Sequence, residues 1–335
     1  MTCSPETQRR STLLLSRADV AALLDLDACI AAVEEAFAHH AAGHTLPPGV
    51  LGLPSVDGGF HIKAAGLRLE RGRVAVKCNG NFSRNAERFG MPRIQGLILL
   101  LDADNGFPLA VIDSIEITSL RTGAATAVAA RHLARPESKV ATIVGCGQQG
   151  RVQIRALARV RPIERVLALD VEPARARRFA AEVAEEMGLA AEATDDLSGA
   201  LARSDVCVTC TPSRRAFLMR GQVPPGLFLA AVGADSHDKQ EIDPALTASC
   251  TVVADHLEQC ATIGEVHHAL EAGLMTRAQV HAELADVVSG KRPGRTSPDE
   301  IILFDSTGTA LQDVAAASAV YDEALRKGAG TFFTF

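Results

Sequence analysis

The stretch VATIVGCGQQGRVQIRALARV, residues 140–160, indicates the fold of this chain together with RVLALD, residues 165–170. Residues 140–144 form an apolar run typical of a buried strand, and three glycines follow it in the pattern G-x-G-x-x-G. Glycine-rich turns are common, so the pattern alone indicates little. Its position between a strand and an amphipathic helix predicts the first strand, turn and helix of a Rossmann domain.

This turn is suited to a dinucleotide, because backbone N–H groups at a helix N-terminus bind pyrophosphate and glycines permit its close approach. Asp170 ends the next strand, where a carboxylate accepts hydrogen bonds from ribose hydroxyls and repels a 2′-phosphate. We therefore expect NAD, although Arg175 and Arg177 leave room for some use of NADP. The structural alternative is a tight turn followed by a surface acid. The cofactor-binding residues predicted from this region and from a later strand end are Gly145, Gly147, Gln148, Gln149, Gly150, Asp170, Thr211 and Pro212.

Strand-like and helical segments alternate between residues 140 and 304, which is typical of a parallel, doubly wound sheet. Before that region, short apolar runs separated by Gly, Asn and Asp predict an antiparallel sheet. These runs are residues 60–65, 74–78, 94–101 and 108–112. Residues 43–54 are rich in Gly and Pro and are expected to form a loop. The spacing of apolar residues predicts helices at residues 18–40, 118–134 and 310–327.

The length of 335 residues predicts two domains. The predicted fold class is α/β, with a Rossmann domain built on a doubly wound parallel sheet and a second, α+β domain. A net charge of -6 gives no electrostatic reason to expect a nucleic-acid partner. Apolar runs are shorter than the roughly 20 residues of a membrane helix, and residues 1–10 lack an apolar signal core. No membrane partner and a cytoplasmic location are therefore expected.

The eight cysteines are scattered, which favours a reducing compartment. Cys207 and Cys210 have the C-x-x-C spacing of some redox and zinc sites. They lie in an apolar run without a second such pair, so we interpret them as buried structural thiols. No metal site is predicted, and four histidines without an assignable partner are interpreted as surface or structural residues: His61, His237, His267 and His268.

Five further segments carry a family resemblance. They are VKCNGN (76–81), GMPRIQG (90–96), EITSLRTGA (116–124), VGAD (232–235) with KQE (239–241), and IGE (263–265). With the glycine motif they make the chain resemble the ornithine cyclodeaminase and mu-crystallin family over nearly its whole length. The resemblance implies a homodimer, a substrate-binding and dimerisation domain of residues 1–122 and 310–335, and a Rossmann NAD-binding domain of residues 123–309. It also implies chemistry at the Cα of an amino or imino acid.

By this resemblance, Lys77 matches the family's active-site lysine, Arg121 its carboxylate-binding arginine and Asp235 its catalytic aspartate. The chemistry agrees, because reduction of an imino acid requires a cation for the carboxylate and a group that exchanges a proton with the nitrogen. Thr122 and Val232 lie in the matching segments and are added to the predicted cofactor-binding residues. From the residues alone, each also has an ordinary explanation. Lys77 is then a solvated strand lysine, Arg121 pairs along its helix, and Asp235 caps a helix N-terminus.

Lys63 and Arg93 depart from the family pattern, which commonly has uncharged residues at these places. Facing the substrate, they would repel the side-chain ammonium of ornithine and attract a second carboxylate. The alternative is that one or both point to solvent, as most basic residues do. Lys63, Arg93 and Arg121 are the predicted substrate-binding residues.

We therefore predict an NAD(H)-dependent imino acid reductase or amino acid dehydrogenase that acts on a small substrate, for example the acidic iminosuccinate. One alternative is an ornithine cyclodeaminase, which converts ornithine to proline and ammonia with NAD as a catalytic cofactor. Another is a mu-crystallin-like protein that binds the cofactor without significant turnover. The presence of Lys77, Arg121 and Asp235 in this chain argues against that last alternative.

Overall fold

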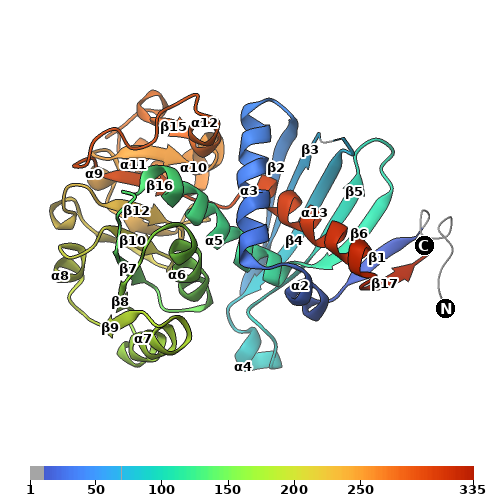
Figure 1. Ribbon diagram of the computed structural model, residues 1–335, viewed down its shortest axis with the longest axis horizontal. Helices are drawn as coiled ribbons and strands as arrows, with labels where there is room; N and C mark the ends of the chain where they lie inside the picture. The colour runs from blue at the N-terminus through green and yellow to red at the C-terminus, as the bar shows by residue number, and fades with distance from the viewer. Residues whose placement is uncertain (1–10, 69) are drawn as a thin grey trace. The chain divides into compact units, whose positions relative to one another are not determined.

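A computed structural model describes residues 11–68 and 70–335 of the chain. It divides the chain into two compact units (Figure 1). The first unit comprises Met1–Arg121 with Thr309–Phe335, and the second comprises Thr122–Gly308. No helix in the described residues is both long enough and apolar enough to cross a membrane.

The second unit is built on a parallel sheet of eight strands in the order β15-β14-β16-β12-β10-β7-β8-β9. The strand order departs in opposite directions from β7, so the carboxyl ends of β7 and β10 flank the point where a doubly wound sheet binds ligands. The strands are β7 Val140–Val144, β8 Arg165–Leu169, β9 Ala190–Ala193, β10 Val206–Thr209, β12 Phe228–Ala231, β14 Thr251–Ala254, β15 Ala282–Glu283 and β16 Ile302–Asp305.

Helices and a small two-stranded sheet complete the second unit. The longer helices, α6 and α7, present apolar faces to the sheet, with residues such as Ile154, Leu157 and Phe179 fully buried. The helices are α6 Gln148–Val160, α7 Pro173–Met187, α8 Leu197–Leu201, α9 Pro244–Thr247, α10 Leu257–Ile263, α11 Glu265–Glu271 and α12 Leu284–Val288, with 3₁₀ turns η1 Arg220–Gln222 and η2 Arg277–Gln279. The small sheet pairs β11 Arg214–Leu218 with β13 Gln240–Ile242.

The first unit is built on a seven-stranded mixed sheet in the order β17-β1-β6-β5-β4-β3-β2. Strands β2 to β6 pair antiparallel, as the sequence predicts for its four central runs, whereas β1 joins β6 in parallel. The strands are β1 Thr12–Leu15, β2 Thr45–Ser55, β3 Gly58–Leu67, β4 Arg73–Phe82, β5 Ile94–Asp102, β6 Pro108–Asp113 and β17 Thr331–Phe333. The helices that begin in this unit are α2 Arg17–Leu23, α3 Leu26–Ala41, α4 Asn85–Phe89, α5 Ser114–Leu133 and α13 Ala310–Lys327.

The two faces of this sheet differ in burial. Side chains alternate between faces along a strand, so residues paired across strands share a face. One cross-strand row is buried and comprises Lys63, Lys77, Ile98 and Ile112. Helix α13 packs on β3 and β4, and α3 packs beside it (Figure 1). Two lysines thus share a buried row of the sheet.

The prediction of a loop at residues 43–54 is wrong, because most of this segment belongs to β2. Pro47 and Pro48 lack an N–H donor and would disrupt a central strand. They are tolerated here because β2 ends the sheet order, and because the register with β3 shifts between Leu46 and Gly49. The edge position is a property of the whole sheet, which the local proline-rich pattern does not indicate.

Candidate active site

A buried cluster of charged side chains lies within the first unit. Asp313, in the first turn of α13, receives Lys77 and Arg121 on its two carboxylate oxygens. The Lys77 Nζ atom lies 2.6 Å from Oδ2, and the Arg121 Nε atom donates to Oδ1 over 3.1 Å. Arg121 also donates through Nη1 to the Oε1 atom of Gln312 over 3.0 Å. All four residues are buried, so the cluster is shielded from bulk water.

The local fold places β4 and α5 against each other near this cluster. Asn79 lies two residues beyond Lys77 on the same strand and is itself buried. Its Oδ1 atom accepts a 2.6 Å hydrogen bond from Ser114, the first residue of α5, and its Nδ2 atom donates to Thr118 over 3.4 Å. The strand that carries Lys77 and the helix that carries Arg121 are therefore held together by side-chain hydrogen bonds.

Burial dominates the electrostatics of Lys77. It lowers the pKa of this ammonium to about 7; Asp313 acts to raise the pKa, and Arg121 and Lys63 lower it further. Burial also acts to raise the pKa of Asp313, but Lys77 and Arg121 outweigh it and hold that pKa below its usual value. At neutral pH Asp313 is therefore ionised, while Lys77 is near the midpoint of its titration.

Of the two additional cations, the structure brings Lys63 to the cluster. Lys63 pairs directly with Lys77 across β3 and β4, is 7% exposed, and contributes to the low pKa of Asp313. Arg93 is exposed and donates to the Oδ1 atom of Asn81 over 3.0 Å. Its role in substrate binding stays a prediction that this geometry does not support directly.

The cluster has two basic side chains and one acidic side chain, because Lys77 and Arg121 share the single carboxylate of Asp313. Buried cations beside one shared carboxylate favour a bound anion, and a guanidinium binds a carboxylate with good geometry. Sequence reasoning missed Asp313, because an acid in the first turn of a helix is ordinarily explained by the helix dipole. The only feature of the sequence that could have indicated Asp313 is its position in the helix predicted at residues 310–327.

In the second unit, the glycine turn after β7 has the backbone that its sequence requires. Gly145 has φ +103°, a conformation that side chains disfavour, and a Cβ there would lie 2.8 Å from the Cys210 carbonyl oxygen. At Gly150 a Cβ would lie 2.4 Å from the Gly145 oxygen, so only glycine lets α6 approach the strand this closely. Gly147 begins α6 as its N-cap, and no protein atom lies within 4 Å of where its Cβ would stand.

Two observations indicate that this turn fits a dinucleotide. The space beside Gly147 lets a ligand approach the backbone at a helix N-terminus, where pyrophosphate binds. The Oε1 atom of Gln149 is buried and has no hydrogen-bond partner among the described residues. Gln148 lies exposed at the start of the same helix.

Asp170 lies immediately after β8, and its side chain is 5% exposed. Its Oδ2 atom accepts a 2.9 Å hydrogen bond from the Cys146 backbone within the glycine turn. Its Oδ1 atom accepts from Glu172 N over 2.9 Å and lies 3.6 Å from Arg175. Arg175 also pairs with Glu172 at 2.5 Å, so two acids hold this arginine, which disfavours a 2′-phosphate beside it.

Glu241 organises the loops that follow β10 and β12. This fully buried carboxylate accepts hydrogen bonds from the backbone and hydroxyl of Thr211, both at 2.7 Å, and from Gly233 N at 2.9 Å. Burial raises its pKa, while hydrogen bonds from Thr209 and Thr211 act in the opposite direction. The predicted cofactor neighbours Thr211, Pro212 and Val232 thus lie on loops joined by one acid. Glu241 lies in one of the segments that carry the family resemblance, but the sequence does not indicate that it joins these two loops.

Asp235 lies four residues beyond β12, on the loop that also contains Val232. Its side chain is half exposed and its Oδ1 atom lies 2.5 Å from the Nζ atom of Lys239. Thr122 is buried on α5 at the first position of the second unit. Asp235 belongs to the second unit and Lys77 and Arg121 to the first, so their assigned roles together remain a prediction.

The C-x-x-C cysteines behave as structural thiols. Cys207 lies within β10 and is fully buried, and burial raises the pKa of its thiol. Burial also raises the pKa of Cys210, whose Sγ atom donates to the Gly145 carbonyl over 3.2 Å. Raised thiol pKa values disfavour the thiolate that redox and metal chemistry require.

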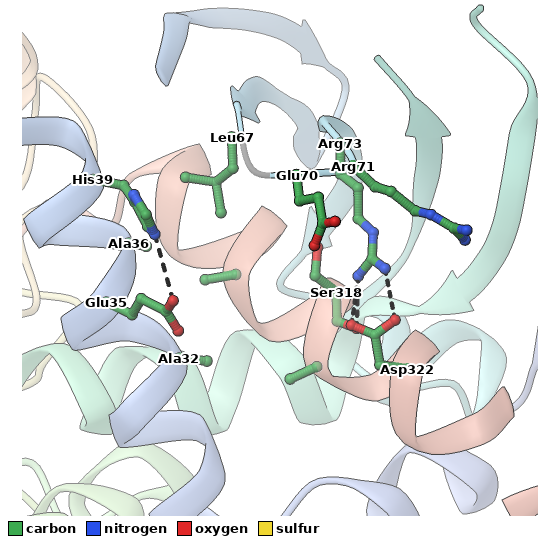
Figure 2. Close-up of a pocket in the computed structure, with 12 residues that line it drawn as sticks. Ala32, Glu35, Ala36, His39, Leu67, Glu70, Arg71, Arg73, Ser318 and Asp322 are labelled. Carbon is green, nitrogen blue, oxygen red and sulfur yellow. Dashed lines mark hydrogen bonds and ion pairs between the residues drawn. The ribbon is translucent and has the colours of Figure 1, made fainter. Parts of the chain in front are cut away.

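A cavity of about 540 Å³ lies elsewhere in the first unit, between α3, α13 and the β3–β4 connection (Figure 2). Several of its charged groups are already engaged: Arg73 makes two hydrogen bonds to Asp322 at 2.6 and 2.8 Å, and His39 lies 3.4 Å from Glu35. None of the predicted site residues lines it. We therefore place the candidate site at the Lys77–Asp313–Arg121 cluster.

Comparison with known proteins decides the family. The model of the ornithine cyclodeaminase/mu-crystallin family matches residues 10–328. The chain belongs to this family. An alanine dehydrogenase of Archaeoglobus fulgidus is 38% identical over 97% of this chain and 98% of its own length. An iminosuccinate reductase of Paracoccus denitrificans is 35% identical over 94% of this chain and 98% of its own length.

Solved structures of family members give the same result. An archaeal alanine dehydrogenase dimer with bound NAD has a TM-score of 0.92 at 38% identity, covering 97% of this chain and 99% of that one. The Paracoccus denitrificans iminosuccinate reductase with NAD+ has a TM-score of 0.90 at 33% identity, covering 97% and 100%. A Thermococcus litoralis Δ1-pyrroline-2-carboxylate reductase with NADH and L-proline has a TM-score of 0.90 at 32% identity, covering 96% and 99%.

These findings confirm the predicted family and the predicted fold class. The predicted enzyme class, an NAD-dependent oxidoreductase of amino or imino acids, is that of these relatives. The predicted cofactor is the one bound in their structures.

Proposed function

We propose that this family member is an NAD(H)-dependent reductase of a small 2-imino acid, and that its preferred substrate is a dicarboxylic one such as iminosuccinate. The observation that carries the proposal is the buried pairing of Lys77 and Arg121 on the one carboxylate of Asp313. Lys63, directly opposite Lys77 on the neighbouring strand, adds a third cation to the same buried face. Such a cluster suits a substrate with more than one carboxylate.

The cofactor, when bound, supplies the hydride that reduces the imine carbon. The backbone of residues 145–150 would hold its pyrophosphate, and Asp170 its ribose hydroxyls. On the substrate, the Arg121 guanidinium holds the carboxylate at C1, and the charged Lys77 attracts the same anion and polarises the imine. Asp235 exchanges a proton with the nitrogen. Asp313 acts as a positioning residue, because its ion pairs hold Lys77 and Arg121 in place.

Ornithine is a poorer match than a dicarboxylate. Its side-chain ammonium would meet buried cations, and repulsion between like charges is strong where water is excluded. The 35% identical iminosuccinate reductase acts on an acidic substrate, which supports the proposal, while the 38% identical alanine dehydrogenase makes pyruvate with ammonia the main competitor. Turnover of oxaloacetate and of pyruvate, each with ammonia, distinguishes these two substrates.

A panel assay tests the proposal. Purified protein is given NADH and ammonia with oxaloacetate, pyruvate or glyoxylate, and separately NAD with ornithine, while absorbance and ammonia are followed. We expect the highest kcat/KM with oxaloacetate. Faster turnover of pyruvate would contradict the dicarboxylic preference, and ammonia release from ornithine without net change in NADH would indicate cyclodeamination. No reaction with any substrate would favour a binding protein.

Lys63 provides a sharper test of the preference. Lys63→Gln removes one cation from the buried row and should lower kcat/KM for oxaloacetate by about tenfold or more, the effect of about 1.4 kcal/mol, while pyruvate changes little. Lys139→Gln alters an exposed lysine that pairs with Glu164 and serves as the control. An unchanged ratio of oxaloacetate to pyruvate in Lys63→Gln would remove this residue from the substrate site.

A further inference from the structure

Three potential metal ligands converge in the second unit, apart from any role in the proposed reaction. His267 and Glu271 lie one turn apart on α11, and His237 lies on the loop after β12. The His267 Nε2 atom is 3.4 Å from Glu271 Oε2, and the His237 Nε2 atom is 3.9 Å from Glu271 Oε1. The two imidazole rings lie 4.4 Å apart between centroids. One ligand atom from each residue falls within 4.8 Å of the other two.

His267 carries the observation that points to a ligand. Its side chain is 9% exposed, and its Nε2 atom is buried without a hydrogen-bond partner among the described residues. The backbone of Ala261 also faces the ring and acts to raise the pKa of His267, while burial lowers it. Metal-binding histidines typically donate their second nitrogen to a backbone carbonyl. Nε2 thus faces Glu271 Oε2 at 3.4 Å without making a hydrogen bond, and a buried nitrogen without one ordinarily requires an explanation.

We propose that His237, His267 and Glu271 form a site for a divalent transition-metal ion, with zinc as the best match. Two imidazoles and one carboxylate are a known zinc ligand set, in which a water takes the fourth position. Bonds of about 2.0 to 2.2 Å in a tetrahedral site separate ligand atoms by roughly 3.4 Å. The observed separations need only a small movement of two exposed side chains, His237 and Glu271.

Such an ion would fasten the loop that contains Asp235 to α11. One polar contact already joins these segments, since the Nε2 atom of His268 lies 2.7 Å from the carbonyl oxygen of Lys239. Lys239 in turn pairs with Asp235. A metal ion would attach the loop to α11 at His237 as well as at Lys239, and so would restrain the residues between them.

Calorimetric titration of the chelator-treated full chain with Zn²⁺ tests the proposal. We expect one ion per chain, and affinity at least about 100-fold lower in His237→Ala and in Glu271→Gln, since loss of an outer partner alone typically costs about 10- to 100-fold. The control is His39→Ala, which removes a histidine that lies 3.4 Å from a glutamate one turn away but belongs to no three-residue group in the described chain. It should bind Zn²⁺ like the unaltered protein.

Two further measurements do not depend on enzyme activity. Co²⁺ in place of Zn²⁺ should give the visible absorption of a tetrahedral site with nitrogen ligands, and this absorption should be lost in His237→Ala. Zn²⁺ should slow amide hydrogen exchange across residues 235–239. Absence of Zn²⁺ binding, or unaltered affinity in both ligand variants, would overturn the proposal.

Discussion

At the residue scale, the low pKa of Lys77 links the proposed chemistry to pH. A lysine whose pKa is lowered to about 7 by burial is charged below that pH and neutral above it. Its attraction for a substrate carboxylate is therefore present in the acidic range and lost as pH rises. Asp313, whose pKa is held low by Lys77 and Arg121, remains ionised throughout that range.

We expect the affinity for a substrate carboxylate to fall by up to about tenfold between about pH 6 and pH 8, as the charged fraction of Lys77 falls. The dissociation constant of an unreactive dicarboxylate, measured in each buffer by calorimetry, reports this directly. Lys77→Met should bind weakly at both pH values with little dependence on pH. The same pH dependence in that variant would show that another group is responsible.

Asp313 should also be important for stability. Asp313→Asn leaves Lys77 and Arg121 buried without their shared carboxylate, and loss of one partner from a buried ion pair typically costs about 3 to 5 kcal/mol. The free energy of unfolding, measured with urea, should fall by this amount. Asp322→Asn is the control on the same helix: its exposed carboxylate pairs with Arg73, and its loss should cost no more than about 1 kcal/mol. Equal losses would contradict this account.

At the element scale, glycines in the turn between β7 and α6 have two different roles: Gly150 permits close packing, and Gly147 leaves space for a ligand. Gly150→Ala places a Cβ against the Gly145 oxygen and should destabilise the fold by about 1 to 3 kcal/mol. Gly147→Ala meets no protein atom within 4 Å and should lower the melting temperature much less, by the small cost of alanine at an N-cap, while weakening NADH binding. Thermal unfolding and NADH titration distinguish the two. Unaltered NADH affinity in Gly147→Ala would remove the turn from the cofactor site.

How far the sequence predicts an element depends on what determines it. Segments governed by local signals were predicted well: α13 spans Ala310–Lys327, as expected, and β7 and β8 flank the glycine turn. The strand β2 was missed because its edge position, which makes Pro47 and Pro48 tolerable, is a property of the sheet. Lys77 and Arg121 are predicted site residues only through the family resemblance, whereas Asp313 and Glu241 contact partners that are distant in sequence, which no local pattern indicates.

At the scale of the whole molecule, the first unit's sheet leaves an apolar row uncovered. Leu51, Ile62, Cys78 and Leu97 pair across four strands, on the face opposite Lys63 and Lys77. Leu51 and Leu97 are each more than half exposed. Exposed apolar patches of this kind favour association, and the related archaeal alanine dehydrogenase is a dimer. We expect this face to form the interface of a homodimer.

Sedimentation velocity tests that expectation. The protein should sediment as a dimer, and Leu97→Glu should shift it toward monomer by burying a charge in the interface. Leu325→Glu, which alters an exposed leucine on α13, should leave the dimer intact. A monomeric wild-type protein, or a Leu97→Glu variant that remains fully dimeric, would show that this face is not the interface.

The proposed reaction is hydride transfer from NADH to the C2 atom of a dicarboxylic imino acid. The most direct measurement supplies NADH with both C4 hydrogens replaced by deuterium, together with oxaloacetate and ammonia, and analyses the product by mass spectrometry. We predict aspartate that carries one deuterium at Cα. Absence of aspartate, or aspartate without deuterium, would contradict the claim.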